Sequence, residues 1–266
     1  CVPRSLGRKN QKKLAAAVLD DTSNDVAARS VRKVTAPEEI VAFRRTVAQE
    51  LTVEAQATSA QTAVISSEDL SRLKSKDEIT RVFQMLSPLC ETLKVIFFLR
   101  RQDLLAASRY NSILHGGNAK AKVFPAAGNT ALHYYDYKSS INTWVSIVGV
   151  TNLYVTCYPE RPSHTYFDPV RHFCELIGIE SSTYKQVQTG ALPLDAVNQI
   201  ILRKHNAVLG RAHKDERAVL IDRLQPLNEP ELKHAVSAAQ AEQFYMQFHE
   251  SNLALFQSLG LDTHMF

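Results

Sequence analysis

The pattern of apolar and polar positions predicts a chain in which helices alternate with a few short strands. Apolar residues recur at helical spacing in five stretches, and we expect helices at 11–19, 37–54, 77–90, 134–148 and 168–177. The run KVIFFL (94–99) does not alternate with polar residues, which indicates a strand buried on both faces, as in a parallel sheet. Two further strands are predicted, TAVISSEDL (62–70), which leads into a helix start, and NLYVTC (152–157).

Local signals refine these boundaries. Thr35 is predicted to cap the helix at 37–54, with Pro37 in its first turn. The small residues and two lysines of 116–131 predict a loop. Residues 1–60 and 193–266 are predicted to be mainly helical, with a last long helix at 231–258.

Strands that alternate with helices predict right-handed βαβ crossovers and therefore a fold of the α/β class. We expect three layers, α/β/α, around a parallel sheet, followed by a helical C-terminal half. A length of 266 residues and an apolar content of 45% are sufficient for one such domain, and we predict a single domain over 1–266.

Composition excludes several classes of protein. The net charge of +4 is mild and its basic residues are scattered, which argues against nucleic-acid binding. The four cysteines form no CxxC pair or metal spacing, so we expect no metal, no disulfide framework and a reducing, cytoplasmic location. No apolar run is as long as a membrane span, and we expect no signal peptide. The sequence leaves the oligomeric state open.

Charged residues follow two of the predicted strands, where ligands bind in parallel sheets. The strand at 62–70 ends in SSED, with Glu68 and Asp69, and the strand at 94–99 is followed by RRQD, with Arg100 and Arg101. A guanidinium group matches the oxygen atoms of a phosphate and keeps its charge at any relevant pH. These residues therefore predict a site that binds an anion and moves a proton.

A structural interpretation of the same residues stays open. Ser67 would cap a helix, with the two carboxylates at the positive end of its dipole. The two arginines would form surface ion pairs with Asp103 or Glu91. Ser108 lies eight residues after Arg100, about two helical turns, and would either face the phosphate or bond its own helix backbone.

The stretch LRRQDLLAASRYNSIL (99–114) resembles the 3′-phosphate-binding element of sulfotransferases, and its RRQD is similar to the signature of a bacterial sulfotransferase-like family. VISSEDL (64–70), residues 134–161 and 168–179, and FHESNLALFQSLGLDTHMF (248–266) also resemble that family. The resemblance covers 60–180 and the last twenty residues. It implies a P-loop NTPase-like fold and transfer of a sulfuryl group from 3′-phosphoadenosine-5′-phosphosulfate (PAPS) to a hydroxyl of a glycan or another small acceptor.

The resemblance also implies roles for five residues. Arg100 and Ser108 would bind the 3′-phosphate of the nucleotide. Glu68 stands where relatives keep the catalytic base and would accept the proton of the acceptor hydroxyl. Arg101 and Tyr110 are weaker candidates for contacts with nucleotide or acceptor.

The chain departs from the family in one respect. Sulfotransferases hold the 5′-phosphosulfate in a loop of lysine, glycine and threonines after their first strand, and no such loop follows a strand here. We therefore expect that the sequence is truncated and that the polypeptide as given is inactive. The alternatives are a non-catalytic descendant that binds a nucleotide or glycan, and a P-loop small-molecule kinase.

Overall fold

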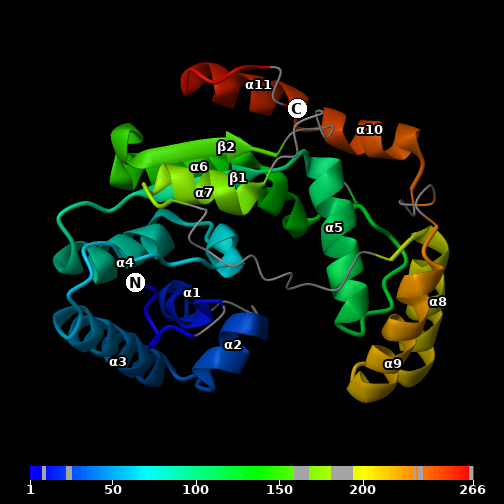
Figure 1. Cartoon of the computed structure of the whole chain (residues 1–266), viewed down its shortest axis with the longest axis horizontal. Helices are drawn as coiled ribbons and strands as arrows, with labels where there is room; N and C mark the ends of the chain where they lie inside the picture. Colours follow the sequence, from blue (N-terminus) through cyan, green and yellow to red (C-terminus); the bar gives the residue numbers. More distant parts are fainter. Residues whose placement is uncertain are drawn as a thin grey trace. The chain divides into compact units, whose positions relative to one another are not determined.

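The computed structural model describes residues 1–7, 10–21, 26–126, 128–158, 168–180, 194–229, 232, 236–263 and 266. Helices predominate in this part of the chain (Figure 1). The α-helices are α1 (Lys12–Val18), α2 (Val26–Arg32), α3 (Pro37–Gln56), α4 (Lys76–Leu86), α5 (Gln102–His115), α6 (Tyr137–Val148), α7 (Pro169–Leu176), α8 (Ala196–Leu209), α9 (Lys214–Leu224), α10 (Ala238–Met246) and α11 (His249–Ser258). Short 3₁₀ segments are η1 (Glu68–Arg72), η2 (Ser87–Leu89), η3 (Thr130–Tyr135), η4 (Val150–Asn152) and η6 (Gln225–Leu227).

A small parallel sheet of two strands, β1 (Val95–Leu99) and β2 (Leu153–Cys157), confirms two of the predicted strands. Successive side chains of a strand point to opposite faces. Phe97 contacts Trp144 of α6, with ring centroids 6.1 Å apart, and Phe98 contacts Phe173 of α7, at 6.4 Å. Each face of β1 therefore contacts a helix. A mostly helical chain with such a sheet is compatible with the α/β class.

The third predicted strand, at 62–70, is wrong as a strand of this sheet. Its first residues form no strand, and backbone groups among them bond to the N-terminal segment. Val64 donates to the carbonyl of Cys1 (2.7 Å), and Ser66 donates to Oε1 of the buried Gln11 (2.7 Å). Because these partners satisfy the segment's polar groups, it needs no neighbouring strand.

The chain divides by its internal contacts into two compact units, and the single domain over 1–266 stays a prediction. Unit 1 contains Cys1–Phe97 and Asp136–Val155, and unit 2 contains Phe98–Tyr135 and Thr156–Phe266. The boundary falls inside each strand.

Unit 1 is built around α1, which contacts α2, α3 and α4 (Figure 1). Leu14 to Val18 are all buried, because leucine, alanine and valine occupy nearly every position of this short helix. A helix that is apolar on all sides belongs in the middle of a bundle. The predicted helix at 11–19 is thus confirmed, as the centre of the unit.

The C-terminal end of α1 receives arginine side chains from its three neighbours. The last carbonyls of a helix lack donors within the helix. Three guanidinium groups donate to them, from Arg32 to Ala16 (2.5 Å), from Arg44 to Ala17 (2.7 Å) and from Arg81 to Val18 (2.7 Å). These bonds join α2, α3 and α4 to one helix end.

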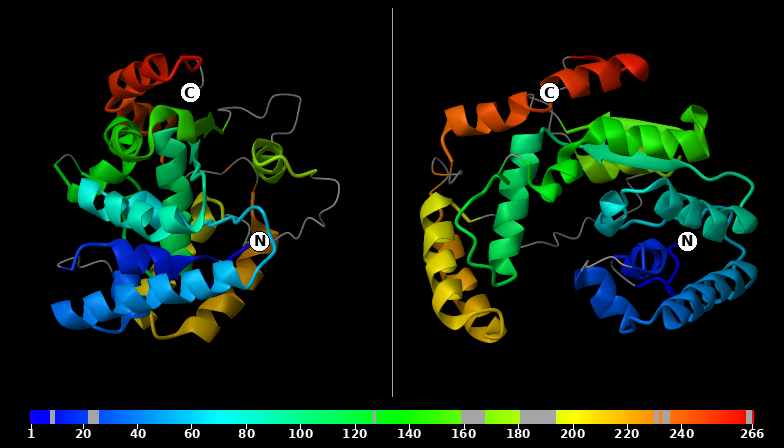
Figure 2. Two further views of the ribbon diagram at one scale, coloured as in Figure 1. Left: turned by 90° about the vertical axis from the view of Figure 1, so that its left-hand side faces the viewer. Right: turned by 180° about the vertical axis from the view of Figure 1, so that it is seen from behind.

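Unit 2 is organised around α5, which contacts α8 and α10, while α8 and α9 lie side by side (Figure 2). One core cluster contains Tyr110, Leu114, Leu194, Leu202, Ile221 and Leu224, and a second contains Ala106, Tyr135, Phe244 and Phe248. Gln102 and Asn252 are fully buried and exchange two hydrogen bonds of 2.9 and 3.0 Å. This reciprocal amide pair joins α5 to α11.

Several predicted boundaries are corrected. Helix α3 begins after Ala36 rather than Thr35, because the Glu39 side chain accepts from the Ala36 amide (3.4 Å) and closes the first turn. The single helix predicted at 231–258 is two helices, α10 and α11, with Phe248 between them in the second core cluster. Burial of Phe248 stabilises the break, which the apolar pattern alone does not indicate.

The cysteines give a testable prediction. Cys1 and Cys90 are exposed, and Cys157 and Cys174 are buried. Burial raises the pKa of the Cys157 thiol to about 12, so that roughly one thiol in ten thousand is ionised at pH 8. We expect Ellman's reagent to label two thiols of the native protein quickly and the other two only in guanidinium chloride. Four fast thiols in the native protein would contradict the buried positions.

Candidate functional site

The carboxyl ends of β1 and β2 lie side by side. The amide of Tyr158, directly after β2, donates to the carbonyl of Leu99, the last residue of β1 (2.7 Å). Arg100 follows Leu99 and is half-buried. The predicted strand-end arginine therefore stands beside a tyrosine that follows the neighbouring strand.

Tyr158 is a candidate that the sequence prediction did not include. Burial raises the pKa of its phenol, and the nearby charge of Arg100 opposes that shift. The ring of Tyr158 also lies 6.0 Å from that of Phe98. A phenol and a guanidinium group at one strand edge are suited to hold an oxyanion next to a flat ring. The sequence contains a signal for Tyr158, because this residue directly follows the predicted strand NLYVTC. The prediction was limited to charged groups at strand ends and therefore missed an uncharged phenol.

Arg101 is held by side chains of unit 2. Its Nε and Nη2 donate to the two carboxylate oxygens of Asp103, at 2.8 and 2.9 Å, and its guanidinium lies 5.1 Å from the ring centre of Tyr245 in α10. Asp103 is buried, so this ion pair is shielded from water. Asp103 is one of the two partners that the structural interpretation of the sequence names, but the ion pair is largely buried and not on the surface.

Ser108 and Tyr110 point to different environments of α5. Ser108 is exposed, and its backbone carbonyl accepts from the hydroxyl of Ser112 (3.2 Å). Tyr110 is buried and belongs to the core cluster with Leu114 and Leu202. Ser108 is thus placed to meet a ligand in solution, while Tyr110 contributes to packing. The predicted contacts of these two residues with a nucleotide stay predictions.

Glu68 lies in unit 1 and is the exposed first residue of η1. The hydroxyl of Ser67 donates to Asn10 (2.7 Å) and does not cap the following helix, so that part of the structural interpretation is wrong. The buried carboxylate of this segment belongs to Asp69, whose Oδ1 lies 3.3 Å from Nε of Arg72. Among the described residues no group donates to its Oδ2.

The five predicted residues are thus divided between the units. Arg100, Arg101, Ser108 and Tyr110 are contributed by one continuous segment of unit 2, from the end of β1 into α5. Glu68 belongs to unit 1. Arg100 at the end of β1, Ser108 on the outside of α5 and Tyr158 after β2 each carry a group that can donate a hydrogen bond to a phosphate.

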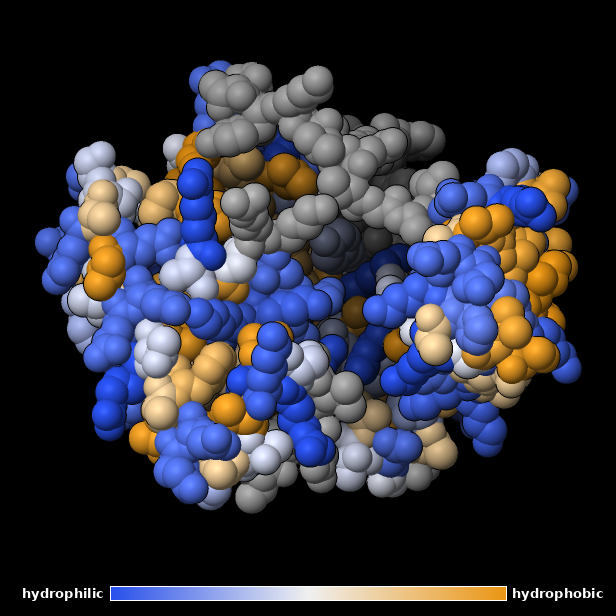
Figure 3. Space-filling view, turned by 90° about the horizontal axis from the view of Figure 1, so that it is seen from below, coloured by the Kyte–Doolittle hydropathy of each residue, from blue (hydrophilic) through white to orange (hydrophobic). Residues whose placement is uncertain are grey.

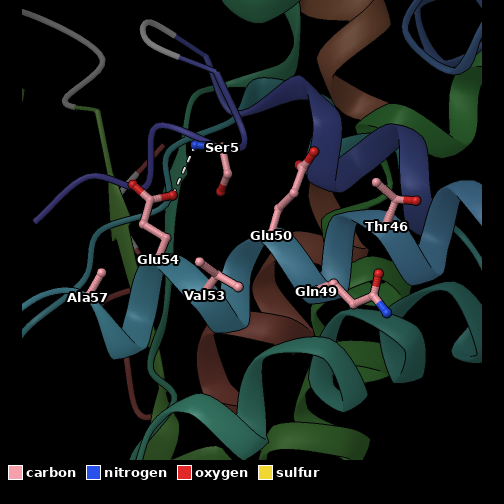
Figure 4. Close-up of a pocket in the computed structure, with 7 residues that line it drawn as sticks. All are labelled: Ser5, Thr46, Gln49, Glu50, Val53, Glu54 and Ala57. Carbon is pink, nitrogen blue, oxygen red and sulfur yellow. Dashed lines mark hydrogen bonds between the residues drawn. The ribbon is translucent and has the colours of Figure 1, made fainter.

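A shallow hollow of about 400 Å³ lies in unit 1, between α3 and the N-terminal segment (Figure 4). Its two carboxylates are engaged within the protein. The carboxylate of Glu54 accepts from the amides of Arg4 (2.6 Å) and Ser5 (3.0 Å), and Glu50 pairs with Lys13. None of the predicted site residues lines it; the lining residues are Ser5, Thr46, Gln49, Glu50, Val53, Glu54 and Ala57.

Two further observations and the comparisons with known proteins complete the description. In the part of the chain that the structure describes, no helix is both long and apolar enough to cross a membrane. The same residues contain no group of three or more histidine, cysteine or acidic side chains arranged to hold a metal ion. No family model, curated protein or solved structure matches this chain.

Proposed function

We propose that the chain is part of a sulfotransferase-like protein that takes a sulfuryl group from PAPS and transfers it to a hydroxyl of a glycan or another small acceptor. The observation that carries the proposal is the position of Arg100. It is half-buried at the carboxyl end of a parallel strand, next to Tyr158, and α5 starts two residues later. Ligands of α/β proteins bind at this end of the strands.

The proposed roles follow from the chemistry of these groups. Arg100 would bind the 3′-phosphate with its planar pair of donors, and the exposed hydroxyl of Ser108 would add a neutral hydrogen bond. Glu68 would accept the proton of the acceptor hydroxyl while that oxygen attacks sulfur. The bond from sulfur to the phosphate oxygen then breaks, and adenosine 3′,5′-bisphosphate leaves. No step in this scheme needs a metal ion.

The proposal includes a three-layer, P-loop NTPase-like arrangement around the parallel sheet. The contacts of Phe97 with α6 and of Phe98 with α7 support it, since each face of β1 meets a helix. It also includes a cytoplasmic location, which the four free cysteines support.

Nucleotide binding by the chain tests the proposal before any turnover is measured. We expect calorimetry in the presence of EDTA to show adenosine 3′,5′-bisphosphate binding at least tenfold more tightly than adenosine 5′-monophosphate. The two ligands differ only in the 3′-phosphate, which a guanidinium group recognises. Equal affinities would contradict the proposal. ATP binding that requires magnesium would instead favour a kinase.

A further inference from the structure

Helix α8 buries three amide side chains beside Leu202 and leaves most of its aliphatic side chains exposed. Its buried face is rich in amide side chains, and three of them, Asn198, Gln199 and Asn206, are at most 5% exposed. Its outer face carries Val197, Ile200, Ile201 and Val208, which are between 42% and 82% exposed. A surface helix normally places its aliphatic stripe inward.

The side-chain nitrogens of the buried amides all donate hydrogen bonds, and these polar contacts help to specify the orientation of α8. Asn206 donates to the carbonyls of Leu114 (2.8 Å) and Asn118 (2.9 Å), at the end of α5. Asn198 donates to the carbonyl of Leu224 in α9 (3.2 Å). Rotation of α8 to bury its aliphatic face would leave these groups without partners, at a cost for each. The aliphatic stripe therefore stays outward.

The exposed residues form one stripe. At 100° per residue, Val197, Ile200, Ile201 and Val208 fall within about 100° of arc, on the side opposite the buried amides. Seen from below, orange side chains gather at the right-hand edge of the molecule, the side on which α8 and α9 lie in Figure 1 (Figure 3). Continuous exposed aliphatic surface of this kind marks an interaction site.

One charge lies inside the stripe. Lys204 is exposed and projects between Ile200 and Val208 on the same arc. The rest of the segment is also basic, with Arg203, Arg211 and Lys214 and no acidic residue from 196 to 214. A partner must therefore combine an aliphatic surface with negative charge, and a carboxylate must meet Lys204 near the middle of the contact.

We propose that the outer face of α8 binds an acidic amphipathic helix of a partner protein. Such a helix would place its aliphatic stripe against Val197, Ile201 and Val208 and a glutamate or aspartate opposite Lys204. A buried ion pair within an aliphatic contact fixes the register of two helices. The proposal is independent of nucleotide binding.

Two other occupants fit the surface less well. In a symmetric antiparallel pair of α8 helices, Lys204 would approach Lys204 of the second copy, since it lies near the middle of the helix. A membrane surface would take up the aliphatic stripe, but a lysine in its centre would have to turn away from the lipid, and α8 contains no aromatic residue.

Reversing the charge at Lys204 and at the matching position of a probe peptide tests this inference. The probe is a fluorescent, helix-forming peptide of sixteen residues with leucines at i, i+4 and i+11, glutamate at i+7 and further glutamates at the rim. We expect saturable binding by the full chain in fluorescence anisotropy, and about tenfold weaker binding by Lys204→Glu. A peptide with lysine at i+7 should show the opposite preference. Ile201→Ser should weaken both pairings.

The control Lys120→Glu makes the same change in net charge at an exposed position outside α8, and should bind the acidic peptide as the wild type does. Lack of saturable binding, or equal binding to wild type and Lys204→Glu, would overturn the inference. So would preferential binding to phosphatidylserine vesicles, or a concentration-dependent dimer in sedimentation that Ile201→Ser abolishes.

Discussion

Replacing Arg32 with alanine is expected to lower the free energy of unfolding of unit 1 by about 3 kcal/mol or more. Arg32 is 5% exposed, and its guanidinium donates to the carbonyls of Ala16 (2.5 Å) and Leu19 (2.9 Å). Both carbonyls belong to buried residues at the end of α1. Without the guanidinium, Ala16 loses that donor in a place where water cannot easily replace it.

The neighbouring arginines cannot compensate fully. Arg44 also donates to Leu19 (2.9 Å), so that carbonyl keeps one partner in the variant. The guanidinium of Arg81 already donates to the carbonyl of Val18 (2.7 Å) and to the carboxylate of Asp20 (2.5 Å). The variant Arg32→Lys keeps the charge but lacks the planar set of donors. Its free energy of unfolding should lie between those of Arg32→Ala and the wild type.

Trp144, the single tryptophan of the chain, makes this prediction measurable. It is buried in α6 of unit 1, so its fluorescence in guanidinium chloride reports the unfolding of that unit. The matched control is Arg45→Ala, because Arg45 is exposed on α3, and its effect should stay within about 0.5 kcal/mol. If both alanine variants unfold at the same denaturant concentration, the arginine cap contributes nothing to stability.

Hydrophobic periodicity predicted the positions of β1, β2, α1 and α3 closely, because in each the local pattern and the tertiary environment agree. It failed where distant groups decide the structure. The segment at 62–66 is not the predicted strand, and Cys1 and Gln11 provide hydrogen-bond partners for its backbone. Such pairing over more than fifty residues leaves no local signal in the sequence.

The same limit applies to the candidate site and to α8. The sequence indicated Arg100 because an arginine after a fully apolar strand is unusual. It did not indicate that Arg101 pairs with Asp103, since both arginines follow the strand directly. In α8 the aliphatic residues alternate with amides at helical spacing, and only the hydrogen bonds to α5 and α9 reveal which face is buried.

Replacing Arg100 with alanine is expected to weaken the binding of adenosine 3′,5′-bisphosphate about 100-fold or more, because the proposed contact with the 3′-phosphate would combine a charge with two parallel hydrogen bonds. The same substitution should raise the pKa of Tyr158, because the positive charge that opposes the effect of burial is gone. Calorimetry measures the affinity. Chemical shifts of tyrosine labelled with ¹³C at the ring measure the titration, and a shifted pKa shows that the two side chains are adjacent in solution.

Two further arginines separate a role in binding from a role in folding. Arg101→Ala leaves the buried carboxylate of Asp103 without its bidentate partner, so it should lower the stability of unit 2 and weaken nucleotide binding less than Arg100→Ala does. Arg171 in α7 has a side chain that is 68% exposed, and Arg171→Ala should change neither property. Unchanged affinity in Arg100→Ala would sink the assignment of the 3′-phosphate site. An equal loss in Arg100→Ala and Arg171→Ala would indicate that general positive charge, rather than the end of β1, attracts the nucleotide.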